Sequence, residues 1–253
     1  MSISTPTVVL VHGAFADAAG WFGVVDELQR DGIPVIAPPN PLRGLASDAA
    51  YVASVAARID GPVVLVGHSY GGAVITVAGT AENVVGLVYV AAYVLEEGES
   101  LGELQGRFPA APLAAHLRRW TCPVEGGAGV PEVGVAEEAF PAVFAADVSA
   151  SVGRVLAACQ RPLAASAFTE TASAAAWKAK PSWAVVAGAD QAINPEVERF
   201  GAKRAGATTV EFDGASHAVA ISRPRAVADL IREAVRATGE RATAGERATR
   251  RKT

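Results

Sequence analysis

Cysteine and histidine are scarce in this chain of 253 residues, which contains two cysteines and four histidines. Cys122 and Cys159 are too few for a disulfide framework, and neither belongs to a C-x-x-C or Cys/His pattern that would hold a metal ion. We expect two free thiols, as in a reducing compartment, while a bridge between them stays open as the alternative. The shortage of histidine also leaves few candidates for a catalytic base.

The chain also lacks an excess of basic residues, since 22 Lys and Arg stand against 26 Asp and Glu, for a net charge of -4. Nucleic acids and anionic membranes bind broad basic surfaces, so both are disfavoured as partners. No run reaches the roughly 18 apolar residues of a membrane-spanning helix. Residues 1–7 do not have the basic and then apolar pattern of a signal peptide. We therefore expect a cytoplasmic protein, of unknown oligomeric state.

The composition is otherwise that of a soluble globular protein, with 51% hydrophobic and 19% charged residues. In the first ninety residues, short and continuously apolar runs alternate with segments of helical character. This pattern is typical of βα units around a parallel sheet that helices cover on both faces. The expected strands are 8–11, 34–37, 63–66, 85–91, 183–187 and 208–212. The expected helices are 20–30, 47–59, 69–79, 196–205 and 224–236.

The alternation of strands and helices stops near residue 96 and resumes near residue 180. The segment between them has no strong strand pattern but several Ala-rich helical stretches, separated by prolines and by a glycine cluster at 126–129. We interpret 96–180 as a helical cap inserted into one α/β domain that spans 1–238. The sequence GERAT then occurs at 239–243 and again at 245–249. This polar repeat has nothing to bury, so disorder is expected over 239–253.

The pattern G-x-S-x-G occurs twice, around Ser69 and around Ser100. In a nucleophile elbow, a strand enters a strained turn that carries the serine, and a helix follows at once. The apolar run 63–66 supplies that strand before Ser69, and 72–75 begins the helix after it. Ser100 follows the charged segment 96–99 instead. The context therefore identifies Ser69 as the nucleophile and Ser100 as a chance match.

A serine hydroxyl needs a base to remove its proton, and His217 is the best placed of the four histidines. It follows the last predicted strand and precedes the final helix, at the carboxyl edge of the sheet beside Ser69. An ordinary surface-loop histidine is the alternative interpretation. His12 and His68 flank glycines in loop motifs, where we expect packing and hydrogen bonding. His116 lies in the insertion with no diagnostic neighbours.

The residue that orients the base should be a carboxylate between the serine and the histidine in chain order, at the end of another strand. Asp190 meets both conditions. It would fix the tautomer of His217 and stabilise the imidazolium that forms during attack. Glu96 and Glu97 also follow a strand and are the fallback candidates. Asp213 is so near His217 along the chain that a role in the turn suits it better.

Negative charge develops on the substrate carbonyl oxygen in acyl transfer, and backbone N–H groups aimed at that oxygen stabilise the transition state. One donor should be Tyr70, which follows the nucleophile. The other should come from the loop after the first strand, with Ala14 as the first candidate and Phe15 as the second. The alternative is that His12 and Gly13 form an ordinary tight turn.

The residues that carry these roles resemble the α/β-hydrolase superfamily over 7–237. They are His12-Gly13-Ala14-Phe15, Gly67-His68-Ser69-Tyr70-Gly71-Gly72, Asp190 and His217. The resemblance implies a mostly parallel sheet of about six strands flanked by helices, and it is nearest to the compact branch of small carboxylesterases, plant methylesterases and hydroxynitrile lyases. The lyases carry a lysine after the catalytic histidine, where this chain has Ala218. Dehalogenases and epoxide hydrolases of the superfamily have aspartate in place of the elbow serine.

These residues and the resemblance predict hydrolysis of small carboxylic esters through an acyl-enzyme, with no metal or organic cofactor. Substrate would enter between the sheet edge and the cap, with Phe15, Trp120 and Phe144 as the first candidates for contact. Further aromatic candidates for this pocket are Phe108, Phe140, Phe168 and Trp177. Thioesterase, lactonase, amidase and cofactor-free perhydrolase activities can use the same triad and stay open. A non-catalytic protein of this fold that binds small molecules is the alternative from another class.

Overall fold

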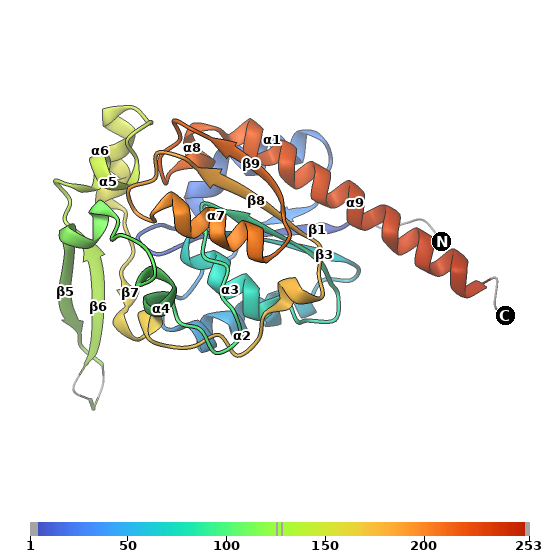
Figure 1. Cartoon of the computed structure of the whole chain (residues 1–253), viewed down its shortest axis with the longest axis horizontal. Coiled ribbons are helices and arrows are strands. Elements are labelled where there is room, and N and C mark those ends of the chain that lie inside the picture. Colours follow the sequence, from blue (N-terminus) through green and yellow to red (C-terminus); the bar gives the residue numbers. More distant parts are fainter. Residues whose placement is uncertain (1–4, 125, 128, 251–253) are drawn as a thin grey trace.

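A six-stranded sheet forms the centre of the molecule (Figure 1), in a computed structural model that describes residues 5–124, 126, 127 and 129–250. The strand order is β2-β1-β3-β4-β8-β9, and every neighbouring pair is parallel. The strands are β1 (Thr7–Val11), β2 (Val35–Ile36), β3 (Val63–His68), β4 (Val84–Val90), β8 (Ser182–Ala187) and β9 (Thr208–Phe212). The predicted parallel sheet of about six strands is confirmed, with β2 at the edge shorter than expected.

The strands are apolar because helices cover both faces of the sheet. Along β1, the side chains of Val8 and Leu10 belong to one hydrophobic cluster, and those of Val9 and Val11 belong to another. This is the two-residue period of a strand, and all four side chains are fully buried. Burying one such side chain stabilises a fold by about 1.5–3 kcal/mol relative to leaving it in water. The sheet is therefore the middle layer of three.

The two helical layers can be followed in Figure 1. One contains α1 (Phe22–Arg30), α8 (Val219–Ser222) and α9 (Pro224–Arg250), and the other contains α2 (Leu45–Ala57), α3 (Tyr70–Ala78) and α7 (Pro195–Arg204). Helix α9 packs on α1 and over β4, while α3 packs on α2 and over β3. Because all strands are parallel, the loops that follow β1, β3, β8 and β9 meet at one edge of the sheet.

The insertion at 96–180 lies against that edge and contains a second sheet (Figure 1). Its helices are α4 (Leu101–Gln105), α5 (Phe140–Phe144) and α6 (Ala150–Ala158), with 3-10 helices at Pro112–His116, Ala165–Phe168 and Ala176–Lys178. Its antiparallel strands are β5 (Leu117–Cys122), β6 (Val130–Val135) and β7 (Leu163–Ala164). The prediction of a cap made of helices alone is wrong in this respect. Strand β5 is mostly exposed and lacks the apolar alternation that marks a strand in sequence.

Helix α9 continues well beyond residue 236, where the sequence predicted its end, and reaches Arg250. It therefore runs through 239–250, for which the sequence predicted disorder. The repeat in this segment is rich in Ala, Glu and Arg, which are among the strongest helix formers. That local preference accounts for helix where the lack of apolar partners predicted disorder. The remaining residues of the prediction, 251–253, lie outside the described residues.

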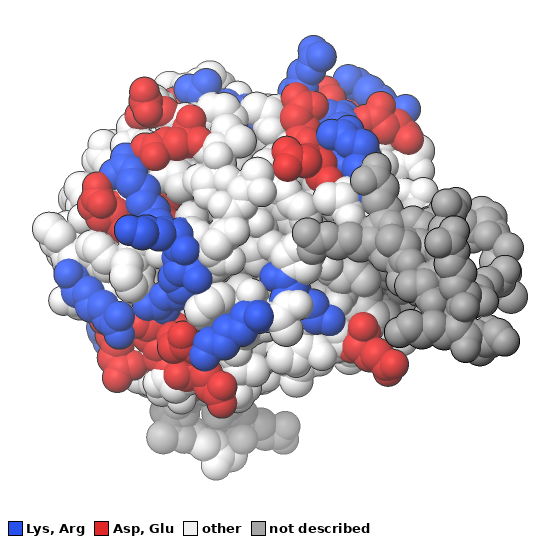
Figure 2. Space-filling model, turned by 45° about the vertical axis from the view of Figure 1, so that its right-hand side comes forward, with Lys and Arg blue, Asp and Glu red and all other residues white. Residues whose placement is uncertain are grey.

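Charged side chains of both signs are interspersed on the face shown in Figure 2. Among the ion pairs of the described residues, the guanidinium of Arg232 pairs with Glu27, Asp31 and Asp229. Ion pairs between fully exposed side chains contribute roughly 0–1 kcal/mol each, so the fold depends mainly on the two apolar clusters. In the part of the chain that the structure describes, no helix is long and apolar enough to cross a membrane.

Candidate active site

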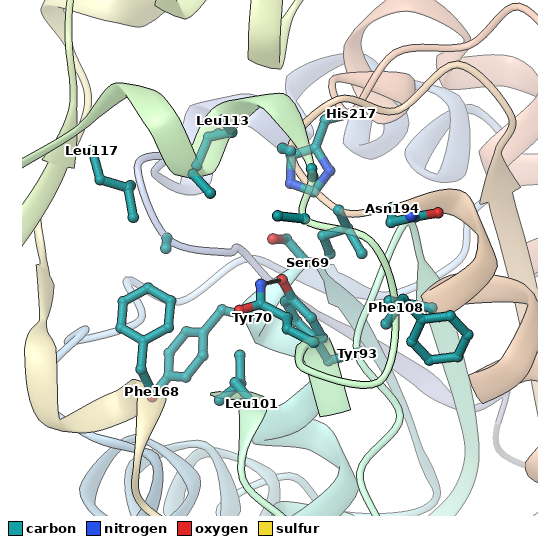
Figure 3. A pocket seen from close by; sticks show the side chains of 18 of the residues that line it. Ser69, Tyr70, Tyr93, Leu101, Phe108, Leu113, Leu117, Phe168, Asn194 and His217 are labelled. Carbon is teal, nitrogen blue, oxygen red and sulfur yellow. Dashed lines mark hydrogen bonds between the residues drawn. The ribbon is translucent and has the colours of Figure 1, made fainter. Parts of the chain in front are cut away.

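Ser69 lies in the sharp turn between β3 and α3. Its backbone has φ 55° and ψ -123°, a strained conformation of the kind found at a nucleophile elbow. Glycine is needed on both sides of the serine. A Cβ atom at Gly67 would collide with the backbone of Gly71, and one at Gly71 would collide with the carbonyl oxygen of Val11. The turn places Ser69 at the edge of a cavity (Figure 3).

Asp190 and His217 come from two other loops at the same edge, which follow β8 and β9. Asp190 Oδ2 lies 2.5 Å from His217 Nδ1, and both side chains are almost fully buried. The other carboxylate oxygen, Oδ1, accepts the N–H groups of Ala192 at 2.6 Å and Ile193 at 2.9 Å. Since Nδ1 faces a carboxylate, it carries the ring proton. The second ring nitrogen, Nε2, is then the one without a proton.

One cavity of about 250 Å³ is lined by both Ser69 and His217, and the close-up shows the His217 ring near the Ser69 hydroxyl (Figure 3). The cavity lies between the sheet edge and the cap. Its lining is mostly apolar and includes Phe15, Leu101, Phe108, Leu113, Phe144 and Phe168. The polar side chains are few, and among them Gln105 donates a hydrogen bond to the hydroxyl of Tyr93. Such a cavity suits a small organic molecule with an apolar body.

The loop after β1 lies directly against the elbow. A Cβ atom at Gly13 would come within 2.6 Å of the Ser69 Cβ atom, so only glycine permits this approach. Ala14 and Phe15 follow, and both line the cavity. The N–H of Phe15 donates to the carbonyl oxygen of Arg161 in the cap, at 3.0 Å. Because Phe15 N–H is engaged elsewhere, Ala14 is the better candidate donor from this loop.

His12 and His68 have the supporting roles expected of them. His12 Nε2 accepts the N–H of Asn40 at 2.9 Å, so Nδ1 holds the proton and donates to the Gly13 carbonyl oxygen at 2.9 Å. His68 Nε2 lies 2.9 Å from the His217 carbonyl oxygen and donates to it. Burial lowers the pKa of His68 well below its ordinary value, and His217 and His12 lower it further. A neutral His68 supports the His217 backbone without adding positive charge.

Three of the predicted pocket aromatics lie outside the cavity. Trp120 on β5 is 44% exposed and donates through Nε1 to Glu132 at 3.0 Å. Trp120, which the sequence predicted to contact substrate, is not among the residues that line this cavity, and its side chain is partly open to solvent. Phe140 is fully buried and stacks on Phe144, with ring centroids 4.6 Å apart. Trp177 donates to a main-chain carbonyl at 2.8 Å and is likewise absent from the lining.

The second G-x-S-x-G serine has a local role at the start of α4. The Ser100 hydroxyl accepts the N–H of Glu103 at 3.2 Å, and the Glu103 carboxylate accepts the N–H of Ser100 at 2.8 Å. This reciprocal pair is a capping box. Glu96, the fallback candidate for orienting the base, forms an ion pair with Lys178 at 2.5 Å. Neither Ser100 nor Glu96 lines the cavity at Ser69.

Cys122 and Cys159 are both free thiols, as the composition led us to expect. Over the described ranges of the chain, no group of three or more His, Cys, Asp and Glu side chains could hold a metal ion.

A family model described as the alpha/beta hydrolase family matches residues 8–230. The match runs from β1 to the first two turns of α9 and includes the elbow, Asp190 and His217. The chain belongs to the alpha/beta hydrolase family. No curated protein has a sequence that matches the chain.

Several solved hydrolase structures share the fold at low sequence identity. Polyneuridine aldehyde esterase is 20% identical with a TM-score of 0.76, and the match covers 89% of this chain and 97% of that one. A pyrethroid hydrolase from Sphingobium faniae is 22% identical with a TM-score of 0.75, over 94% of this chain and 100% of that one. A methylesterase from Arabidopsis is 17% identical with a TM-score of 0.72, and the match covers 91% of this chain and 98% of that one. At these identities the likeness establishes the alpha/beta hydrolase fold.

The sequence did not single out several residues of the hydrolase pocket, namely Tyr93, Gln105, Leu113 and Asn194. They lie in separate segments and belong to no motif. Position was the one available signal. Tyr93 comes shortly after β4 and Asn194 shortly after β8, and binding residues of parallel sheets gather after the carboxyl ends of strands. The two cap residues offered no comparable signal.

Proposed function

We propose that the protein is a serine hydrolase that cleaves small carboxylic esters through an acyl-enzyme intermediate. The observation that carries the proposal is the convergence of Ser69 and His217 on one apolar cavity, with Asp190 holding the far side of the imidazole. The loop of Ala14 and the start of α3 at Tyr70 border the same space. Acyl transfer to serine requires a nucleophile, an oriented base and donors for an oxyanion.

In the first half-reaction, His217 Nε2 takes the proton of the Ser69 hydroxyl while Oγ attacks the ester carbonyl carbon. Asp190 holds Nδ1, which keeps the reactive tautomer and stabilises the imidazolium. The backbone N–H groups of Ala14 and Tyr70 donate to the carbonyl oxygen as it becomes negative. One donor of this kind contributes about 3 kcal/mol to the transition state.

Collapse of the tetrahedral intermediate breaks the bond to the alcohol oxygen, and His217 gives that oxygen its proton. The acyl group stays on Ser69, and the alcohol leaves. In the second half-reaction, His217 removes a proton from water as the water attacks the acyl carbonyl, and Ser69 recovers its proton when the acid departs. The N–H groups of Ala14 and Tyr70 serve both tetrahedral intermediates.

The cavity supports a small and mainly apolar substrate. Its volume of about 250 Å³ and its aromatic and aliphatic lining suit a short acyl chain or a single ring. The names of the relatives, which include an esterase and a methylesterase, favour esters by analogy at the level of the fold. Cleavage of thioesters, lactones or amides and perhydrolysis could use the same three side chains. Assays with a panel of these substrates distinguish them from ester hydrolysis.

The proposal is tested by turnover of p-nitrophenyl esters from acetate to decanoate, with Ser69→Ala and His217→Ala measured in parallel. We expect activity in the parent protein and a loss of at least about 1,000-fold in either variant, as for other members of a triad. The chain length with the highest kcat/KM reports the depth of the cavity. Turnover that persists in Ser69→Ala would refute the mechanism.

A serine-directed phosphonate separates the enzyme from a non-catalytic binding protein of the same fold. We expect a covalent adduct on Ser69, read as a mass increase of the protein and absent in Ser69→Ala. A folded parent protein that neither hydrolyses esters nor reacts with the phosphonate would favour the binding role.

A further inference from the structure

A second carboxyl group is buried behind the catalytic candidates. Glu198 lies in the first turns of α7 and is only 2% exposed. Its Oε2 atom accepts the N–H of Ala187, the last residue of β8, at 2.9 Å. This contact places the Glu198 carboxyl under the loop that carries Asp190. None of the roles assigned above uses Glu198.

The second oxygen of this carboxyl is unusual. In the described part of the chain, no N–H or hydroxyl donor reaches Glu198 Oε1, which is fully buried. Besides the Ala187 N–H group, the polar neighbour of the Glu198 side chain is the Asp190 carboxyl. If both carboxyl groups are ionised, Glu198 and Asp190 can only accept hydrogen bonds, so neither can donate one to the other. A proton on one of them removes this conflict.

The other titratable groups near Glu198 leave it without a compensating charge. Tyr93, from the segment after β4, faces both Asp190 and Glu198 and adds no positive charge. Arg199 on α7 is the nearby cation, and its guanidinium is committed to Glu211 at 2.5 Å. Two ionised carboxylates side by side in a buried site, without a cation between them, are strongly unfavourable.

The number of donors decides which carboxyl holds the proton. Asp190 faces three donors, which are two backbone N–H groups and His217 Nδ1. Glu198 accepts one N–H group. Hydrogen bonds to the charged form favour ionisation, so the charge belongs on Asp190 and the proton on Glu198.

We propose that Glu198 is a positioning residue, protonated in the folded protein, whose carboxylic acid donates a hydrogen bond from Oε1 to the Asp190 carboxylate. In this arrangement the Asp190 carboxylate accepts four hydrogen bonds, from the two backbone N–H groups, the Glu198 acid and His217 Nδ1. Burial raises the pKa of Glu198 well above the ordinary carboxyl value, and the charge of Asp190 raises it further. The inference rests on the proposed function for the roles of Asp190 and His217.

Two variants, Glu198→Gln and Glu198→Leu, test whether the Glu198 side chain is a neutral hydrogen-bond donor or an ionised carboxylate. Glutamine keeps both contacts, since its carbonyl oxygen accepts from Ala187 N–H and its amide donates to Asp190. Leucine keeps the volume and removes both. We expect Glu198→Gln to retain kcat within about threefold, and Glu198→Leu to lose at least about tenfold in kcat with a smaller change in KM.

The acid limb of the pH–rate profile gives the sharper readout, since it reports protonation of His217. Removal of the donor in Glu198→Leu concentrates negative charge on Asp190 and favours the imidazolium, so the limb moves to higher pH by about half a unit or more. In Glu198→Gln, the limb stays within about 0.3 unit of the parent. A limb that moves down by a full unit in Glu198→Gln would mean that an ionised carboxylate had been removed, and it would overturn the proposal.

The titration of His217 can also be followed without any substrate, by imidazole proton–nitrogen NMR of the intact labelled protein. The four histidines allow assignment by comparison with His217→Ala. We expect the midpoint of the His217 titration to follow the acid limb: it should be unchanged in Glu198→Gln and raised in Glu198→Leu. Equal midpoints in the parent and Glu198→Leu would refute the positioning role. If the parent hydrolyses no ester, these NMR shifts still decide the state of Glu198.

Discussion

At the scale of single residues, Gly13 controls how closely the loop after β1 approaches the nucleophile. A methyl group at this position would lie 2.6 Å from the Ser69 Cβ atom, so the loop of Ala14 must move away. We expect Gly13→Ala to lower kcat/KM by about 10–150-fold, because a displaced oxyanion donor costs up to about 3 kcal/mol. Ester turnover of the folded variant measures the effect.

Gly20→Ala is the matched control for this change. No atom lies within 4 Å of a Cβ atom added at Gly20. The control variant should keep kcat/KM within about twofold, as surface substitutions usually do. Equal activity of Gly13→Ala and Gly20→Ala would show that the loop can shift without affecting catalysis.

Protonation of Glu198 also predicts how stability depends on pH. The pKa of Glu198 is raised by burial first and by Asp190 second, so the folded state binds a proton that the unfolded state releases above about pH 4.3. This contribution is complete below that pH and is lost as pH rises toward the pKa of the folded state. The parent should therefore lose up to about 1.4 kcal/mol per pH unit relative to Glu198→Gln over this window.

Urea unfolding of the parent and Glu198→Gln at pH 5, 6 and 7 measures this difference, and the other titrating groups cancel between the two proteins. A difference in unfolding free energy that moves in favour of Glu198→Gln as pH rises is expected. A constant difference would contradict a proton on Glu198.

At the scale of elements, the cap is tied to the core through the loops that carry the site. Leu113 N–H donates to the Gln191 carbonyl oxygen at 2.9 Å, next to Asp190. Ala218 N–H, next to His217, donates to the carbonyl oxygen of Phe144 on α5 at 3.0 Å. The cap therefore both closes the cavity and orders the loops that carry Asp190 and His217. Helices α4 and α5 and the 3-10 helices at Pro112–His116 and Ala165–Phe168 line the cavity together with Leu117 at the start of β5, while Trp120 further along β5 does not.

This division within the cap predicts different effects for two aromatic residues. Phe168, on the 3-10 helix after β7, lines the cavity. Phe168→Ala removes apolar contact area worth about 1–2 kcal/mol, so kcat/KM for p-nitrophenyl butyrate should fall about 5–30-fold, mainly through KM. Steady-state kinetics measures this change.

Trp120→Phe is the comparison variant, since Trp120 is half exposed on β5 and bonds only Glu132 through its ring nitrogen. Its kcat/KM should stay within about twofold of the parent. A larger loss in Trp120→Phe than in Phe168→Ala would mean that substrate reaches the Trp120 side chain.

At the scale of the whole molecule, two apolar clusters on opposite faces of one sheet hold the layers together. Ile231 of α9 is fully buried in the cluster that does not border the cavity. Ile231→Ala should lower the free energy of unfolding by about 2–5 kcal/mol, from lost burial and the cavity left behind. Urea unfolding measures the loss, and ester turnover below the transition should be unchanged.

Val155→Ala provides the control, since this side chain on α6 is 61% exposed. Its unfolding free energy should stay within about 0.5 kcal/mol of the parent. Equal losses of unfolding free energy in Ile231→Ala and Val155→Ala would indicate that α9 contributes little to the cooperative unfolding of the domain.

Elements whose pattern is local were predicted well. The apolar runs at β1, β3 and β8 have the period and length of buried strands, and the expected strands overlap the observed ones. Strand β5 was missed because its side chains are mostly exposed and polar. Its existence depends on pairing with β6, which no single segment reveals. The helix over 239–250 differs from the predicted disorder because its Ala, Glu and Arg residues favour helix locally even though the segment has few apolar residues to bury.

The same distinction applies to the site. The amino-acid sequence by itself determined the strained turn at Ser69, because strand, glycines and helix are adjacent in the chain. It also placed Asp190 and His217 at one edge, since parallel strands end together. Only the tertiary structure decided that Phe168 lines the cavity while Trp120 does not, and that Glu198 lies against Asp190. Those contacts join segments far apart or on different elements, and packing in three dimensions, not local preference, selects them.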